Sequence, residues 1–140
     1  MVRRTFSNER EFCDFAAAFA RRLRPGDVVA LEGPLGSGKT TFVRAVVEAL
    51  HGVDQTSSPT FTFWHRYQGT PPIDHIDLFR IRNPSERSEL GLEDAVGAAG
   101  SIALIEWWRN APDLVPERRY EIAIEGAGDA PRTLSLTEPA

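Results

Sequence analysis

VVALEGPLGSGKTT, residues 28–41, joins a short apolar run to a glycine-rich loop. The loop has the spacing of a phosphate-binding loop: Gly33, four residues, then Gly38, Lys39 and Thr40. Its glycines let successive backbone N–H groups curl around an anion, and the following helix adds the partial positive charge of its N-terminus. Lys39 is predicted to reach the β- and γ-phosphates, and the Thr40 hydroxyl to ligate a bridging magnesium ion. The pattern therefore predicts a site for a magnesium-bound nucleoside triphosphate.

The residues around this loop favour a strand, a loop and a helix in that order. Phe42, Val46 and Leu50 recur at helical spacing, and Gly52 is placed to end the helix. A glycine-rich turn that binds nothing has no use for a lysine and a threonine at these positions. We therefore favour the binding loop over a purely structural turn.

Size, charge and composition narrow the possible classes of protein. A chain of 140 residues fits one domain, residues 1–140, whose last ~10 residues are expected to fray. The net charge of −4 argues against strong binding of a nucleic acid by this chain alone. Cys13 is the single cysteine, which suits a reducing cytoplasm. Neither a membrane-spanning stretch nor an export signal is found, so the sequence predicts a cytoplasmic protein with no membrane role.

An amphipathic helix is predicted before the loop. Its N-cap is Ser7 or Asn8, and Glu11 completes a capping box from Asn8. Periodic apolar spacing is what core packing needs, so the apolar stripe is interpreted as core and not as a platform for a base. The stripe consists of Phe12, Phe15, Ala16, Phe19 and Leu23.

Further strands follow from alternating or continuously apolar runs. They cover residues 61–67, 73–80, 102–105, 119–125 and 132–137. The first two should pair as a hairpin at one edge of the sheet, and the last two as a closing antiparallel hairpin. Residues 84–99 are predicted to form an irregular helix broken at Gly91, and residues 110–116 a short helix or loop. The expected fold class is α/β, a P-loop NTPase-type three-layer sandwich with a mixed, largely parallel central sheet and antiparallel hairpins.

A triphosphate site also needs an acidic group that holds magnesium or positions the attacking water, usually at the carboxyl end of a neighbouring strand. Asp77 and Glu106 are the candidates, although either could be a solvated residue at a strand end. Thr60 is the candidate sensor of the γ-phosphate, with a serine-capped turn as the alternative. His65 and His75 are interpreted as strand-edge histidines, because no cysteine or third histidine lies nearby to complete a zinc site.

Several blocks of the chain together resemble the TsaE family of small bacterial ATPases. The loop alone is common to many nucleotide-binding proteins, whereas the blocks in this order are far more specific, and the resemblance spans nearly the whole chain. Two positions depart from the family pattern: Pro34 where the family usually has Asp, and His65-Arg66 where it often has Glu. The matching blocks are Gly33 to Thr41, Ser58-Pro59-Thr60-Phe61-Thr62, His75-Ile76-Asp77-Leu78-Phe79-Arg80, Leu90-Gly91-Leu92-Glu93-Asp94 and Ile105-Glu106-Trp107.

The resemblance implies a partner-dependent role in tRNA modification. The family's ATPase serves the TsaB and TsaD proteins, which place a threonylcarbamoyl group on adenosine next to the anticodon; TsaE-like proteins do not transfer that group themselves. The implied cofactors are ATP and Mg²⁺. The predicted nucleotide-binding residues are Gly33, Leu35, Gly36, Ser37, Gly38, Lys39, Thr40, Thr41, Thr60 and Trp107; the predicted catalytic residues are Lys39, Asp77 and Glu106; and the predicted magnesium ligands are Thr40, Asp77 and Glu106.

The sequence thus predicts a weak, partner-stimulated, Mg²⁺-dependent ATPase. Magnesium and Lys39 would neutralise charge on the transferring phosphoryl group while Asp77 or Glu106 orients the water, with no covalent intermediate. Two alternatives stay open, a small-molecule kinase and a non-catalytic nucleotide-binding module. The residues that contact adenine, the oligomeric state and the carboxylate that ligates magnesium directly are not determined by the sequence.

Overall fold

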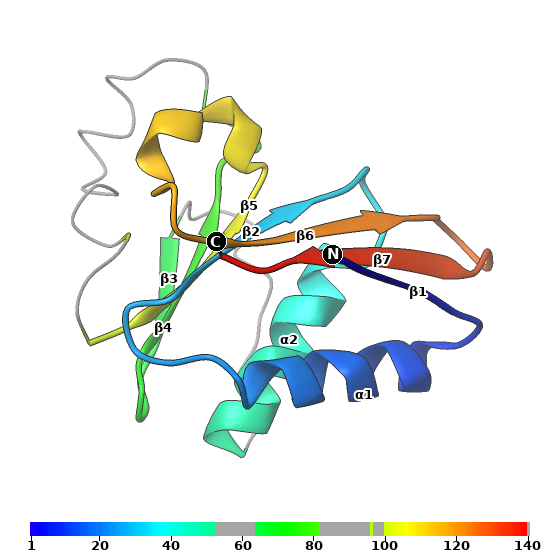
Figure 1. Cartoon of the computed structure of the whole chain (residues 1–140), viewed down its shortest axis with the longest axis horizontal. Helices are drawn as coiled ribbons and strands as arrows, with labels where there is room; N and C mark the ends of the chain where they lie inside the picture. The colour runs from blue at the N-terminus through cyan, green and yellow to red at the C-terminus, as the bar shows by residue number, and fades with distance from the viewer. Residues whose placement is uncertain (53–63, 82–95, 97–99, 140) are drawn as a thin grey trace.

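The computed structural model describes residues 1–52, 64–81, 96 and 100–139, and within these ranges the strands form one seven-stranded sheet (Figure 1). The order across the sheet is β1-β7-β6-β2-β5-β4-β3. The strands are β1 (Val2–Phe6), β2 (Val28–Glu32), β3 (Trp64–Tyr67), β4 (Ile73–Asp77), β5 (Ile102–Glu106), β6 (Tyr120–Glu125) and β7 (Arg132–Thr137), and the helices are α1 (Glu9–Ala20) and α2 (Lys39–His51).

The sheet is parallel at its centre and antiparallel towards its edges. Strand β2 pairs in parallel with β5 and β6, and β4 pairs in parallel with β5. The β3–β4, β6–β7 and β1–β7 pairs are antiparallel. The predicted α/β class, the mixed sheet and both hairpins are therefore confirmed. Strand β5 is buried along its whole length, as its continuously apolar sequence predicts.

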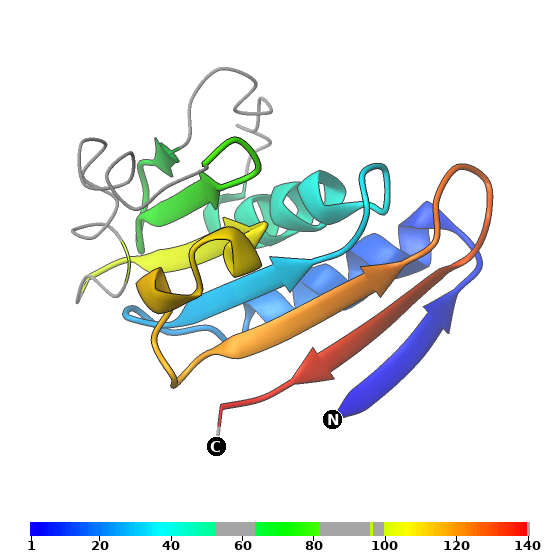
Figure 2. The ribbon, with the colours of Figure 1, turned by 90° about the horizontal axis from the view of Figure 1, so that it is seen from above.

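The two helices pack on the same face of the sheet, as Figure 2 shows. Their contact is aromatic: the rings of Phe12 and Phe19 on α1 lie 6.0 and 5.9 Å from the ring of Phe42 on α2. On the opposite face, the described covering consists of two short 3-10 turns, Trp108–Asn110 and Pro112–Leu114, which pack on a second apolar cluster. The described part of this third layer is therefore thin, and it is made of turns.

The start of α1 and the end of α2 lie at the residues that the sequence indicates, whereas α1 ends at Ala20, before Leu23 of its predicted apolar stripe. Asn8 is the N-cap of α1, and its side-chain oxygen accepts a hydrogen bond from the Glu11 N–H at 2.9 Å. Gly52 ends α2 in a left-handed conformation, φ 77°, and its N–H donates to the Glu48 carbonyl. The phenylalanine stripe of α1 is core, as predicted, because Phe12 and Phe19 are buried.

Other segments differ from the sequence-based expectation. Strand β1 was not predicted, and it adds an antiparallel edge next to β7. Strand β4 ends at Asp77 instead of continuing to Arg80, because the Asp77 carboxylate accepts the Phe79 N–H and turns the chain. The helix predicted for residues 84–99 and the start of the strand predicted for residues 61–67 lie outside the described residues, apart from residue 96.

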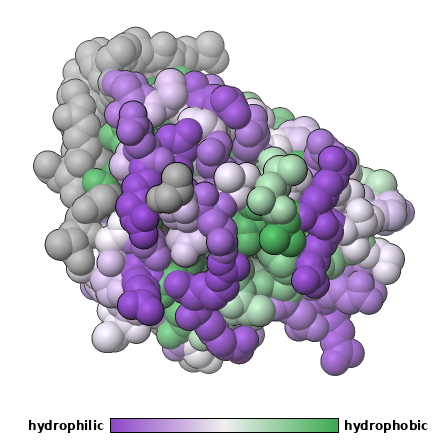
Figure 3. Space-filling view, in the orientation of Figure 1, coloured by the Kyte–Doolittle hydropathy of each residue, from purple (hydrophilic) through white to green (hydrophobic). Residues whose placement is uncertain are grey.

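The surface is mainly polar. On the face drawn in Figure 3, hydrophilic residues predominate and hydrophobic residues reach the surface in smaller groups between them. Among the described residues, no helix combines the length and the apolar character needed to cross a membrane. Large apolar side chains exposed in the described part of the chain are Met1, Val2, Leu35 and Phe79.

A buried carboxylate fixes the β3–β4 hairpin. Asp74 on β4 is fully buried; its Oδ1 accepts from Arg66 Nε at 2.7 Å and Trp64 Nε1 at 2.8 Å, and its Oδ2 accepts from Arg66 Nη2 at 3.0 Å. Burial alone would raise the pKa of the Asp74 carboxyl. The hydrogen bonds from Arg66, Trp64 and Ser101, with the charge of Arg66, outweigh that effect and hold the pKa below its ordinary value. Arg66 thus has a structural partner within its own hairpin.

We expect Asp74→Asn to lower the free energy of unfolding by about 2 kcal/mol near neutral pH, because it removes a buried charge-assisted pair. A carboxyl whose pKa is lowered by folding stabilises the fold above its unfolded pKa, about 4, and loses that effect as the pH falls through the folded pKa. Urea unfolding at neutral pH and at about pH 3 should therefore show a smaller difference between wild type and variant at the lower pH. Asp14→Asn, at an exposed position of α1, is the control and should change stability by less than about 0.5 kcal/mol. A difference that does not depend on pH would contradict the assignment.

Candidate functional site

Parallel pairing brings the carboxyl ends of β2, β5 and β4 to one edge of the sheet. The register places Glu106, the last residue of β5, opposite Leu31 of β2 on one side and Asp77 of β4 on the other. The loop Gly33–Gly38, which we call the β2–α2 loop, begins at this edge and leads into α2. The strand-end carboxylates and the N-terminus of α2 consequently share one region, as ligand sites of parallel α/β sheets do.

The β2–α2 loop needs glycine for two different reasons. A Cβ atom at Gly33 would lie 2.6 Å from both the Ile124 carbonyl oxygen and the Ser37 Oγ, so only glycine lets the backbone pack this closely on β6. Gly36 has open space around it, but its φ of 77° lies in the left-handed region. The loop is closed by a hydrogen bond from the Ser37 N–H to the Pro34 carbonyl at 3.1 Å.

Lys39 is the first residue of α2 and is folded over its own loop. Its ammonium donates to the carbonyls of Gly33 and Pro34 and lies 4.3 Å from the centre of the Trp107 ring. The side chain is buried, with 5% of its surface exposed. Burial lowers the pKa of Lys39, and the nearby carboxylates Glu106 and Asp77 partly oppose this shift.

Trp107 holds an unusual backbone conformation beside Lys39. Its φ of 58° is the one left-handed value among the described residues other than glycine, a conformation that costs about 1–2 kcal/mol for an ordinary residue. The side chain contacts the Phe79 ring at 4.9 Å in addition to the Lys39 ammonium. These contacts hold the indole against the site.

The two strand-end carboxylates are each held by a defined partner. Asp77 accepts the Phe79 N–H at 2.9 Å, and Glu106 Oε2 lies 2.5 Å from His75 Nε2. Burial raises the pKa of the Asp77 carboxyl, and the adjacent Glu106 adds to this shift, against the opposing Phe79 hydrogen bond and the charges of His75 and Lys39. Two acidic side chains close together and partly buried form an environment that a cation would stabilise.

His75 is not a strand-edge residue, and that prediction was wrong. Strand β4 lies between β3 and β5, and His75 is buried, with 1% of its surface exposed. Within the described part of the chain its Nδ1 has no hydrogen-bond partner, and no cluster of three or more metal-ligating His, Cys, Asp or Glu side chains is found. His75 and Asp77 are two residues apart on one strand and so share a face, which is the sequence signal that could have linked His75 to the site.

The predicted site residues largely gather around one pocket of about 390 Å³. Gly33 and Ser37 lie in the same loop but line neighbouring hollows. Thr60 lies outside the described residues. Arg132, which no sequence pattern singled out, joins the lining from β7. The lining comprises Leu35, Gly36, Gly38, Lys39, Thr40, Thr41, Asp77, Phe79, Glu106, Trp107 and Arg132.

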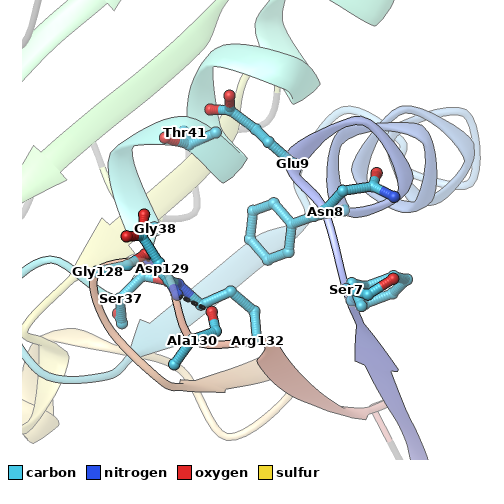
Figure 4. A pocket seen from close by; sticks show the side chains of 12 residues that line it. Ser7, Asn8, Glu9, Ser37, Gly38, Thr41, Gly128, Asp129, Ala130 and Arg132 are labelled. Atoms are coloured by element: carbon cyan, nitrogen blue, oxygen red, sulfur yellow. Dashed lines mark hydrogen bonds between the residues drawn. The ribbon is translucent and has the colours of Figure 1, made fainter.

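A second pocket of about 390 Å³ adjoins the first and shares Gly38, Thr41 and Arg132 with it. Residues 126–131 form the β6–β7 turn. Figure 4 shows Ser7, Asn8 and Glu9, at and just before the start of α1, across this pocket from the β2–α2 loop and the β6–β7 turn. Phe6 and Phe12 supply apolar surface. The two pockets therefore adjoin each other at the N-terminus of α2.

Fold and site together define a class of α/β protein in which a glycine-rich loop leads from a central parallel strand to a helix beside carboxylates from the neighbouring strands. Residues 6–134 match the family model described as "Threonylcarbamoyl adenosine biosynthesis protein TsaE". The chain therefore belongs to the TsaE family.

Individual relatives agree with this membership. The chain is 40% identical over 122 residues to the tRNA threonylcarbamoyladenosine biosynthesis protein TsaE of Bacillus subtilis, covering 86% of this chain and 73% of that protein. It is 39% identical over 135 residues to the protein of the same name from Rickettsia bellii, covering 94% and 91%. The crystal structure of Bacillus subtilis YdiB superimposes with a TM-score of 0.80 at 32% identity, covering 99% of this chain and 86% of that one.

The contact between His75 and Glu106 can be tested by substitution. We expect His75→Phe to lower the free energy of unfolding by about 1–3 kcal/mol, because Glu106 would stay buried without this hydrogen bond. His75→Gln is the matched variant, since its amide nitrogen can take the place of Nε2, and it should retain most of the stability. Urea unfolding at neutral pH measures both. Equal losses in the two variants would show that ring packing, and not the hydrogen bond, accounts for the effect.

Proposed function

We propose that this protein binds Mg²⁺-ATP at the β2–α2 loop and hydrolyses it slowly, in support of the synthesis of threonylcarbamoyladenosine in tRNA. The observation that carries the proposal is the convergence of Lys39, Thr40, Asp77 and Glu106 on one pocket at the N-terminus of α2. A lysine, a hydroxyl and two carboxylates at the start of a helix are the groups that a metal-bound polyphosphate needs.

The loop would hold the polyphosphate through its backbone N–H groups and Lys39. The ammonium of Lys39 lies within the loop, where the carbonyls of Gly33 and Pro34 accept its hydrogen bonds. Phosphate oxygens would compete for the same ammonium with the advantage of full negative charge. Binding thus requires a local rearrangement of one side chain and not of the strand or the helix.

The donor set fits magnesium. Thr40, Asp77 and Glu106 offer the hard oxygen ligands that this ion prefers, and all three line the same pocket. Burial raises the pKa of Asp77 because it disfavours the charged carboxylate, and a nearby cation would favour that charged form. When bound, the ion would supply neutralisation of charge on the phosphates.

The nucleoside would occupy the adjoining pocket between α1 and the β6–β7 turn. That pocket begins at Thr41 and Gly38, directly beside the loop, and Phe6 and Phe12 offer apolar surface for a base. No Asn-Lys-x-Asp segment for reading guanine occurs in the sequence, which favours adenine.

Hydrolysis would depend on positioning of the attacking water by Asp77 or Glu106. Each carboxylate is already oriented, Asp77 by the Phe79 N–H and Glu106 by His75. Preorganised acceptors lower the cost of placing the water at the moment of reaction. Slow turnover is expected for the chain alone, because among the described residues no arginine or lysine other than Lys39 and Arg132 lines the loop pocket, and the donors of Arg132 are engaged by carbonyls.

Lys39 offers a direct test, because it is the only lysine in the sequence. Protein made with lysine labelled with ¹³C at Cε alone gives one side-chain signal, and we expect that signal to move on addition of Mg²⁺-ATP but not of adenosine. Lys39→Ala should raise the dissociation constant for ATP by at least about tenfold and abolish hydrolysis, since a charge-assisted contact to phosphate is lost. Arg118→Ala, an exposed position, is the control. Unchanged binding and hydrolysis in Lys39→Ala would show that the site is misassigned.

Product analysis separates hydrolysis from the kinase alternative. We expect ADP and free phosphate in equal amounts from ATP and Mg²⁺ alone, because water is the acceptor that the site positions. Measurement of released phosphate with and without added small-molecule acceptors checks this. Phosphate transfer that requires an acceptor would contradict the proposal, and binding without any turnover would favour a non-catalytic module.

The family relationship leads us to propose TsaB- and TsaD-like proteins as partners. We expect co-purification with them to depend on the bound nucleotide, because Leu35 and Phe79 line the pocket and are exposed, so a docked protein could contact them. The measurement compares ATP, ADP and no nucleotide, with Lys39→Ala as the variant that cannot respond. The absence of association in all three conditions would contradict the partner assignment.

A further inference from the structure

We propose that Arg132 is a positioning residue that presets the β2–α2 loop for polyphosphate and ties that loop to the β6–β7 turn. The inference rests on the proposed function, because it concerns the same site. Arg132 is the first residue of β7 and lies 95 positions along the chain from Ser37, whose carbonyl it contacts.

The guanidinium of Arg132 divides its donors between two segments of backbone. Towards the loop, Nε donates to the Ser37 carbonyl at 2.8 Å and Nη2 to the Gly36 carbonyl at 3.2 Å. Towards the turn, Nη1 donates to the Ala130 carbonyl at 2.5 Å and Nη2 to the Gly128 carbonyl at 3.0 Å. Figure 4 shows Arg132 with the Ala130 contact dashed, close to Ser37 and Gly38. One planar side chain therefore joins four carbonyls from two loops.

The contacts on the loop side set the direction of its peptide groups. In a trans peptide the carbonyl of one residue and the N–H of the next point in opposite directions. Because Arg132 holds the Ser37 carbonyl, the Gly38 N–H points in the opposite direction within the same peptide plane. The Gly36 carbonyl is held in the same way, while the Ser37 N–H closes the loop on Pro34. Arg132 thereby fixes the orientation of a backbone donor at the N-terminus of α2, where an anion would bind.

The conformation of the β6–β7 turn leaves room for the side chain of Arg132. A Cβ atom at Gly126 would lie 2.4 Å from the Pro131 carbonyl oxygen and 3.2 Å from Cδ of Arg132, so only glycine leaves room for the arginine stem. Within the sheet, Arg132 lies opposite Phe6 of β1, and the next residue, Thr133, lies opposite Glu125 of β6. The guanidinium thus extends from the first residue of β7 onto the β2–α2 loop.

The test compares Arg132→Lys with Arg132→Gln in the full chain. Lysine keeps the charge but cannot hold four carbonyls in a planar fork, whereas glutamine removes the charge as well. We expect both variants to raise the dissociation constants for Mg²⁺-ATP and for inorganic tripolyphosphate by a similar factor of about ten, since both lose the preset loop. Arg3→Gln is the control; Arg3 lies on β1 and forms only a long surface contact with Glu125 at 3.6 Å among the described residues.

A second measurement is made on the wild-type protein and needs the Arg132→Lys variant only to assign the signal. In wild-type protein labelled with ¹⁵N-arginine, the Nε–H of Arg132, identified as the signal missing from Arg132→Lys, should exchange slowly with solvent and shift on addition of tripolyphosphate. Wild-type affinity in Arg132→Lys, or a rapidly exchanging Nε–H, would overturn the inference. If wild type binds ATP and both variants bind it with wild-type affinity, this inference fails alone. If wild type does not bind ATP at all, the proposed function fails with it.

Discussion

The site depends on the register of three parallel strands. Pairing of β2 with β5 and of β5 with β4 puts Glu106 and Asp77 in adjacent positions at the sheet edge from which the β2–α2 loop departs. A slip of one residue in either pair would turn these carboxylates to the opposite face of the sheet. The continuously apolar sequence of β5 and the buried residues of β2 and β4 hold that register, because a slip would also displace their apolar side chains. The packing of the core and the geometry of the site are thus fixed by the same interactions.

Much of this arrangement could be predicted from local sequence. The loop, both helix ends and the strand-end carboxylates each have short-range signals: glycine spacing, the Asn8 cap and acidic residues after apolar runs. The proximity of Asp77 and Glu106 followed from a general property of parallel sheets and not from any pattern linking the two residues. Strand β1 was missed because four of its five residues are exposed, so it shows no apolar alternation.

The contacts that organise the site from a distance could not be read in the same way. His75 was assigned to an edge because the position of β4 inside the sheet depends on its pairing with β5, which is set by tertiary structure. Arg132 lies at the start of β7, whose alternating sequence predicts a strand but not the contacts of its first side chain. The four carbonyls that Arg132 contacts are backbone groups without any sequence signature. Polar residues that bind backbone are in general less visible in sequence than those that recur at regular spacing.

Strand β1 also determines how the sheet ends. Within the part of the chain that the structure describes, it is the outermost strand on its side, and an unpaired strand edge can recruit a further strand from another molecule. Arg3 and Arg4 are both exposed on this short strand. Two copies meeting edge to edge would bring these guanidinium groups close together, and their mutual repulsion would disfavour pairing through this edge.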